Sequence, residues 1–378
     1  MKVAELPNRR NEAWKYSDLR AAVGDALPPL AQAPTSAPPA GKLFRGLKPI
    51  EIVFENGRIA HWPERNVRKG PRVLSKTDAV EPRNPAQLGA WAAELSPDEW
   101  MPIIEAGEDE RPVWLRMIGD AAPTSGHARI GLLVRAGRTL NLIETYEGPA
   151  VGFTNVLIEG FVETGATLNR TVIQDASEKA VLVSTAQLHL ERNARLSQYV
   201  LALGAKLARI ETHVNAEAEG AEVTLNGAYL ADADRHADLT SVMEHKGPGA
   251  VTRQLIKGVA RKGGRGVFQG KIVVERAAQK TDARQHHQGL LLEDGAEIFA
   301  KPELMIYADD VQCAHGNTAG GLDERALFYM RSRGIPEAEA RALLIEAFLT
   351  ETIPEGISEA LRDELTASIR NWLAGASS

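Results

Sequence analysis

The sequence predicts a mostly β protein in which an elongated β-solenoid is followed by a small helical domain. Between residues 111 and 321 the chain consists of short apolar segments separated by glycine, asparagine and charged residues, without a long amphipathic helix. From residue 322 onward, apolar residues recur at steps of three and four, which is the helical period. We therefore expect an N-terminal region of residues 1–110, a β core of residues 111–321 and a helical domain of residues 322–378.

A recurring local pattern favours the solenoid. In the core, a pair of small residues is repeatedly followed, two positions later, by an aliphatic residue. The copies begin at Gly165, Asn193, Gly204, Gly220 and Gly295. Short strands stacked coil on coil bury one continuous aliphatic core. The expected inward positions include Leu168, Leu196, Val223, Leu225, Val273 and Ile298. Because the copies are irregularly spaced, a β-sandwich is the structural alternative.

Composition limits the possible functions. A chain of 378 residues exceeds what one compact core usually serves, which fits an elongated core or two domains. The formal net charge of −6, without a long basic block, argues against a nucleic-acid partner. The sequence contains neither an apolar run of about 20 residues nor a signal-peptide core, so we expect no membrane span and a cytoplasmic location.

The N-terminal region reads as several separate pieces. Residues 10–19 form a polar stretch with aromatic anchors, typical of a docked segment. The proline-rich residues 27–40 predict an extended linker. Residues 50–61 alternate around an Asn-Gly pair, which predicts a hairpin. Residues 84–104 carry a helical spacing of apolar side chains.

The C-terminal domain is punctuated as three helices. Gly334 is suited to end the first, and Pro336 lies where the first turn of the second is expected. Pro354 follows the second helix, and Ser358 can cap the third. Two interpretations fit such a domain: a docking surface for a partner, or a cap that seals the end of the solenoid.

The most informative pair of side chains is Cys313 and His315. Cys313 is the only cysteine of the chain. Residues two apart on a strand share a face, so the thiol and the imidazole would emerge about 7 Å apart. Both are ligands for soft metals, but they supply only two of the four that zinc or an iron–sulfur cluster normally takes. Either another group completes the site, or Cys313 is an inert, buried thiol.

Other candidate motifs fail on detail. The glycine-rich run from Arg261 to Lys271 lacks the spacing of a phosphate-binding Walker A loop, so we expect a tight turn and no nucleotide site on this chain. Neither a Gly-x-Ser-x-Gly elbow nor a His-Glu-x-x-His motif occurs. The adjacent His286 and His287 would point to opposite faces of a strand and could not easily share a ligand.

An ordered set of motifs resembles the SufB/SufD family of iron–sulfur cluster assembly proteins. The resemblance is strongest from residue 261 to residue 349. Its motifs are Trp14-Lys-Tyr16, Ile306-Tyr-Ala-Asp-Asp310, Cys313-Ala-His-Gly316, Leu327-Phe-Tyr329 and Arg331-Ser-Arg-Gly-Ile335. The single cysteine and the sequence His315-Gly-Asn-Thr318 are more similar to SufD-like chains than to SufB-like ones.

This resemblance implies a right-handed parallel β-helix and a non-catalytic scaffold subunit. It implies a SufB-like partner, an ABC-type ATPase similar to SufC that binds the C-terminal helices and hydrolyses the ATP, and a homodimer when the chain is isolated. The family's implicated histidine falls on His315, beside Cys313, at a transient iron or iron–sulfur cluster site shared with the partner. On the same basis we expect ATPase contacts at Leu327, Phe328, Arg331, Arg333, Leu344 and Phe348.

The competing hypothesis is a self-contained β-helix enzyme or binding protein acting on a carbohydrate or acyl substrate. It predicts a cleft lined by paired carboxylates or aromatic side chains. The sequence offers only Asp309 and Asp310 as a local pair, and on a strand their side chains would diverge.

Overall fold

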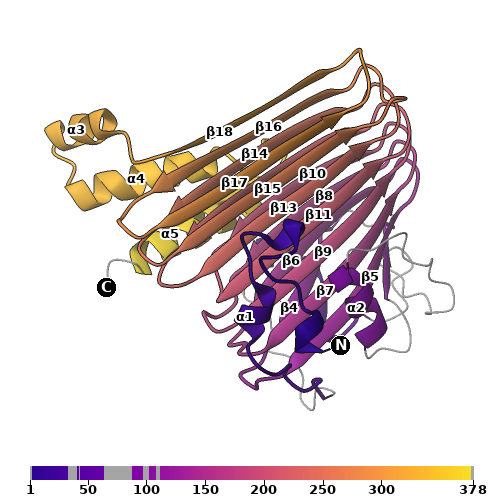
Figure 1. Cartoon of the computed structure of the whole chain (residues 1–378), viewed down its shortest axis with the longest axis horizontal. Coiled ribbons are helices and arrows are strands. Elements are labelled where there is room, and N and C mark those ends of the chain that lie inside the picture. Colours follow the sequence, from indigo (N-terminus) through magenta and orange to yellow (C-terminus); the bar gives the residue numbers. More distant parts are fainter. Residues whose placement is uncertain are drawn as a thin grey trace.

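The core of the computed structural model is a parallel β-solenoid of about seven turns (Figure 1). The structure describes residues 2–32, 41, 43–63, 87–96, 102–107 and 111–375. From β2 onward, successive strands alternate between two sheets. The first has ten strands in the order β18-β16-β14-β12-β10-β8-β6-β4-β1-β2, and the second has eight in the order β17-β15-β13-β11-β9-β7-β5-β3.

Each sheet takes every second strand of the core. The ten-stranded sheet contains β1 (Ile50–Glu55), β2 (Arg58–His61), β4 (Val113–Ile118), β6 (Thr139–Glu147), β8 (Thr167–Gln174), β10 (Arg195–Ala202), β12 (Glu222–Ala231), β14 (Val251–Ala260), β16 (Asp282–Leu291) and β18 (Gln312–Gly320). The eight-stranded sheet contains β3 (Ile103–Glu105), β5 (Ser125–Val134), β7 (Phe153–Val162), β9 (Val181–Leu190), β11 (Leu207–Ala216), β13 (His236–His245), β15 (Arg265–Val274) and β17 (Glu297–Ile306).

The aliphatic core forms columns that run along the solenoid. Because the strands are parallel and in register, equivalent side chains of neighbouring coils stack on one another. One buried column consists of Leu140, Leu168, Leu196 and Val223. Parallel pairing confirms the solenoid over the antiparallel sandwich. The expectation for Val273 is wrong, because it is only half-buried, whereas its neighbours Ile272 and Val274 are buried.

The recurring small-residue pairs lie at the turns between strands. Gly165, Asn193 and Gly220 have positive φ angles of 67°, 54° and 74°, and the alanine after each is fully buried. The spacing of the copies is irregular because the coils differ in length: Val181 pairs with Leu207, 26 residues later, whereas Arg265 pairs with Glu297, 32 residues later.

The glycine-rich run around Gly264 is a turn between β14 and β15, as expected. A Cβ atom at Gly264 would lie 2.2 Å from the carbonyl oxygen of Ala231, which shows how closely the coils approach there.

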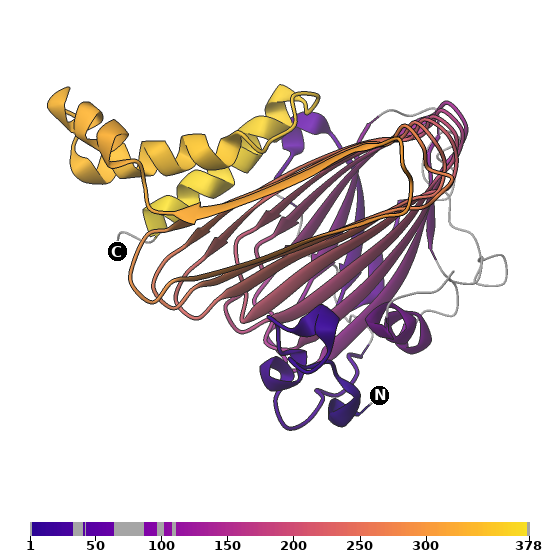
Figure 2. The ribbon, with the colours of Figure 1, turned by 45° about the horizontal axis from the view of Figure 1, so that its top comes forward.

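The N-terminal segment covers the outer face of the eight-stranded sheet (Figure 2). It contains the short helices η1 (Val3–Glu5), η2 (Glu12–Trp14) and α1 (Leu19–Val23), and η3 (Arg45–Leu47) follows later. The β1–β2 hairpin and its Asn56-Gly57 turn confirm the expectation for residues 50–61. Of the helix expected over residues 84–104, the structure has α2 over Gln87–Leu95, and Ile103 belongs to strand β3; residues 84–86 and 97–101 lie outside the described residues. Most of the expected linker, residues 33–40, lies outside the described residues.

The C-terminal helices are α3 (Glu324–Ser332), α4 (Glu337–Thr350) and α5 (Glu359–Gly375). Gly334 has a φ of 87° after α3, and the Ser358 hydroxyl accepts a hydrogen bond from the backbone N–H of Leu361 at 3.4 Å. Ile345 of α4 and Leu365 of α5 pack on outward side chains of the ten-stranded sheet. α4 and α5 therefore cover a sheet face, opposite the N-terminal segment, and do not seal the end of the solenoid, whereas α3 projects beyond the sheet (Figure 2). Among the described residues, no helix is long and apolar enough to cross a membrane.

Candidate metal half-site at the open edge of the solenoid

The solenoid ends in two open strand edges. β18 pairs only with β16, and β17 pairs only with β15, among the described strands. Each of these two edge strands therefore has a row of backbone N–H and C=O groups on its outer side that no neighbouring strand pairs with. Side chains on β17 and β18 are also far more exposed than those of the preceding coils.

Cys313 and His315 both lie on β18, as the sequence predicts. Cys313 is in register with Ala283 of β16, and His315 is in register with Gln285. Ala283 and Gln285 are buried side chains of the solenoid interior. Because neighbouring strands in register place their side chains on the same face, Cys313 and His315 share the interior face of the edge strand. Their two-residue separation keeps them about 7 Å apart.

Cys313 is half-buried and packs against the aliphatic core. Burial raises the pKa of its thiol, and the negative charge of Asp282 adds to this effect, although the backbone at Ala283 partly opposes it. The thiol therefore keeps its proton at neutral pH, and binding of a metal must release that proton.

His315 is exposed, and its imidazole has no hydrogen-bond partner among the described residues. His315 is the last member of a column of polar side chains, stacked from strand to strand in the interior, that includes Gln254 and Gln285. Beneath it, the amide of Gln285 donates to Gln254 at 3.0 Å, and the amide of Gln254 donates to the hydroxyl of Ser241 at 2.8 Å. The Oε1 atom of Gln285 is buried without a partner in the described part of the chain.

His286 and His287 point to opposite faces, as expected. His286 is exposed, whereas His287 is 1% exposed. The His287 ring stacks between Phe268 and Tyr229, with centroid distances of 5.1 and 5.9 Å. Its Nε2 lies 2.9 Å from the hydroxyl of Tyr229, and its Nδ1 lies 2.7 Å from Oδ1 of Asn317. Burial lowers the pKa of His287, so the ring is neutral.

The half-site offers two soft ligands. Within the described residues, no group of three or more His, Cys, Asp or Glu side chains is arranged to hold a metal ion. Thiolate and imidazole suit iron and iron–sulfur clusters, but two donors leave such a group incompletely coordinated.

The residues expected to contact an ATPase divide into two sets. Phe328, Arg331 and Arg333 are exposed on or beside α3, and Phe328 is 73% exposed. Leu327 is buried, so it holds α3 in place and offers little surface. Leu344 and Phe348 are half-buried on α4.

Some features of these helices escape sequence reasoning. Phe348 packs against the sheet, and the Lys257 ammonium lies 4.5 Å from its ring centroid. The exposed apolar side chains of Tyr329 and Leu343 were not among the expected contacts. Helical spacing alone could have drawn attention to them.

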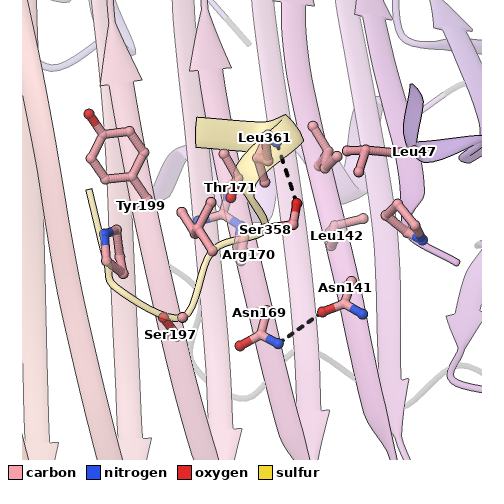
Figure 3. A pocket seen from close by; sticks show the side chains of 15 residues that line it. Leu47, Asn141, Leu142, Asn169, Arg170, Thr171, Ser197, Tyr199, Ser358 and Leu361 are labelled. Atoms are coloured by element: carbon pink, nitrogen blue, oxygen red, sulfur yellow. Dashed lines mark hydrogen bonds between the residues drawn. The ribbon is translucent and has the colours of Figure 1, made fainter. Parts of the chain in front are cut away.

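A cavity of about 410 Å³ lies between the outer face of the ten-stranded sheet and the connection from α4 to α5 (Figure 3). Asn141, Asn169 and Ser197 form part of its wall, and the Asn169 amide donates to Oδ1 of Asn141 at 2.9 Å. Among the described residues that line it, there is no Asp, Glu, His or Cys, and Tyr199 is the only aromatic side chain. This cavity lacks the paired carboxylates or aromatic wall that the carbohydrate or acyl hypothesis predicts.

The fold is a parallel β-solenoid whose open edge strand carries a thiol and an imidazole, side chains of the kinds that can bind soft metals. The family model described as "SUF system FeS cluster assembly, SufBD core domain" matches residues 117–348. The chain therefore belongs to the SufBD family of iron–sulfur cluster assembly proteins.

Individual relatives agree with this assignment. The chain is 27% identical to the iron–sulfur cluster assembly protein SufD of Escherichia coli K12, over 95% of this chain and 86% of that protein. It is 30% identical to a SufBD family protein of Mycobacterium leprae, over 98% of this chain and 91% of that protein. It is 31% identical to the chloroplastic protein ABCI7 of Arabidopsis thaliana, over 72% of this chain and 59% of that protein.

Proposed function

We propose that the chain is a SufD-like, non-catalytic subunit of a cytoplasmic scaffold on which iron–sulfur clusters are assembled. His315, with Cys313 beside it, supplies part of a transient iron or cluster site, and a SufB-like partner supplies the remaining ligands. The observation that carries this proposal is the position of both side chains on the edge strand β18, where a second subunit has access to them.

The cluster is the cargo of this site. A thiol with a raised pKa releases its proton when the metal binds, and an exposed imidazole needs no rearrangement to act as a ligand. Because this subunit supplies only two ligands, the cluster can be released as well as formed: when the partner moves away, the bonds between the cluster and the partner's ligands are lost.

The test compares two histidine substitutions. H315A removes the proposed ligand, whereas H286A removes an exposed histidine from the other face of the adjacent strand. In the complex with a SufB-like scaffold and the ATPase, anaerobic reconstitution followed by absorption spectroscopy should show almost no cluster with H315A. H286A should give the wild-type yield, and both variants should assemble normally by size-exclusion chromatography. A normal cluster yield with H315A would refute the proposal.

We further assign the ATPase contact to the helices α3 and α4. Phe328 places a large apolar side chain in solvent beside the cationic Arg331 and Arg333, a combination common at the centres of protein interfaces. The substitution F328S should weaken ATPase binding by about 2 kcal/mol or more in titration calorimetry. L30S changes another exposed apolar residue, which is 57% exposed and lies far from these helices in the sequence, and should bind normally. Equal affinities for F328S and wild type would contradict the assignment.

A further inference from the structure

A chain of hydrogen bonds connects the interior of the solenoid to the edge strand. Tyr229 of β12 bonds to His287 of β16, and His287 bonds to Asn317 of β18. The Tyr229 ring crosses the intervening strand β14 at Gly258, where a Cβ atom would lie only 1.8 Å from the ring. Gly266 of β15 leaves similar room, since its Cβ would lie 2.0 Å from the same ring. Two glycines thus make space for this connection.

The structure places the oxygen of the Asn317 amide against Nδ1 of His287, and this orientation sets the donors and acceptors of the chain. The amide oxygen of Asn317 accepts only, so Nδ1 of His287 carries the proton and donates it. Nε2 of the neutral ring is then an acceptor, and the hydroxyl of Tyr229 donates to it. Donation therefore runs outward, from the buried tyrosine to the exposed asparagine.

The orientation of the Asn317 amide determines what its NH₂ group faces. Its oxygen is directed to β16, so its NH₂ group is directed away from that strand, where it has no partner among the described residues. Asn317 lies in register with the buried His287 and hence on the same strand face as Cys313 and His315. One face of β18 therefore presents a thiol, an imidazole and a hydrogen-bond donor at successive alternate positions.

We propose that the NH₂ group of Asn317 donates a hydrogen bond to an anionic atom of the cargo, such as a sulfide or thiolate sulfur, and that Tyr229 and His287 hold the amide in this orientation. The inference rests on the proposed function of Cys313 and His315. Hydrogen bonds to cluster sulfurs stabilise their negative charge and raise the reduction potential, and groups that orient the inner ligands affect metal affinity strongly.

The first part of the test uses the isolated chain without any cargo. Nitrogen-15 NMR of the histidine rings should show His287 with its proton on Nδ1. In Y229F, which keeps the ring but loses the donor to Nε2, the Nε2 resonance should shift, while the H286A spectrum keeps the wild-type His287 signals. A proton on Nε2 of His287 in the wild-type chain would overturn the inference, whatever the cluster experiments show.

The second part uses the reconstituted complex and measures the rate at which a chelator removes the cluster, together with its reduction potential. N317A should lose cluster about tenfold faster than wild type and have a lower potential. N317D keeps an oxygen for His287 but has no NH₂ donor, so it should be at least as impaired. T318A alters the neighbouring residue on the other face and should behave as wild type.

These results separate the two proposals. If H315A abolishes the cluster while N317A loses it at the wild-type rate and potential, the role of Asn317 is refuted and the proposed function stands. If H315A forms cluster normally, the proposed function fails and this inference fails with it. Thermal melts of each variant exclude misfolding, which is not expected at the exposed position 317.

Discussion

Removal of the Trp14 side chain should detach the N-terminal segment from the solenoid. Trp14 is 7% exposed, and its ring lies 4.2 Å from the guanidinium carbon of Arg209, which is fully buried beneath it. Truncation of a buried tryptophan to alanine costs about 3–5 kcal/mol, and the lost cation–π contact contributes roughly 1–2 kcal/mol of that destabilisation.

The effect should be local, because the segment is held by few side chains. Besides Trp14, its main anchors are Leu6, Leu19 and the hydroxyl of Ser17, which donates to Asp238 at 2.5 Å. The coils of the solenoid contact mainly their neighbours, so their stability does not depend on the segment. W14A should therefore open residues 2–24 while the solenoid remains folded.

The assay is hydrogen exchange together with limited trypsin digestion, since the segment contains Arg9, Arg10, Lys15 and Arg20. In W14A, exchange and cleavage should rise about a hundredfold or more within this segment, and exchange in the strands should not change. F328A provides the control, because it removes an aromatic ring that is already exposed. Unchanged protection of the segment in W14A, or equal loss of protection throughout the solenoid, would refute the reasoning.

Two further predictions concern buried polar groups. R170M leaves the buried Glu144 without the guanidinium that lies 2.6 Å from it, and should lower the free energy of unfolding in denaturant by about 3–5 kcal/mol. R195M breaks an exposed ion pair and should lower it by under about 1 kcal/mol. Similar losses of stability in the two variants would contradict this prediction. Burial lowers the pKa of His245 to about 4, below the unfolded value of about 6.5, so its contribution to stability is present at neutral pH and lost as the pH falls through this interval. Between pH 7 and 4.5 the free energy of unfolding of H245Q should therefore fall by about 2–3 kcal/mol less than that of the wild type; an equal fall in both proteins would exclude His245 as a cause.

The sequence predicts the solenoid and the shared strand face of Cys313 and His315 because both depend on local patterns. Pairs such as Gly165-Ala166 mark turns through their backbone conformation, and Cys313-Ala-His315 marks a shared face through strand alternation. Val273 could not be assigned correctly in this way, because three consecutive apolar residues leave open which of them face inward. The pairing of Ile272 with Met243, a contact between distant residues, decides the outcome.

The hydrogen-bonded connection from Tyr229 to Asn317 could not be predicted from the sequence either, because it also depends on contacts between distant residues. Its members come from three different strands, and only the register brings them together. The adjacent histidines indicate that one of them is buried, but they do not reveal its partners. From the sequence alone, Gly258 is only a glycine that would weaken its strand. The structure shows that its missing side chain makes room for the ring of Tyr229.

Two neighbouring columns of the interior end in different side chains at the open edge. The column of Leu140, Leu168, Leu196 and Val223 continues through Thr252 and Ala283 to Cys313. The neighbouring column is polar well before the edge: it passes from Arg170 and Gln198 through Leu225, Gln254 and Gln285 to His315. Aliphatic side chains at the last coil would leave an apolar strand edge in solvent, which favours aggregation. The polar side chains of Gln285 and His315 avoid this, and under the proposed function the edge stays available for a partner that brings further ligands.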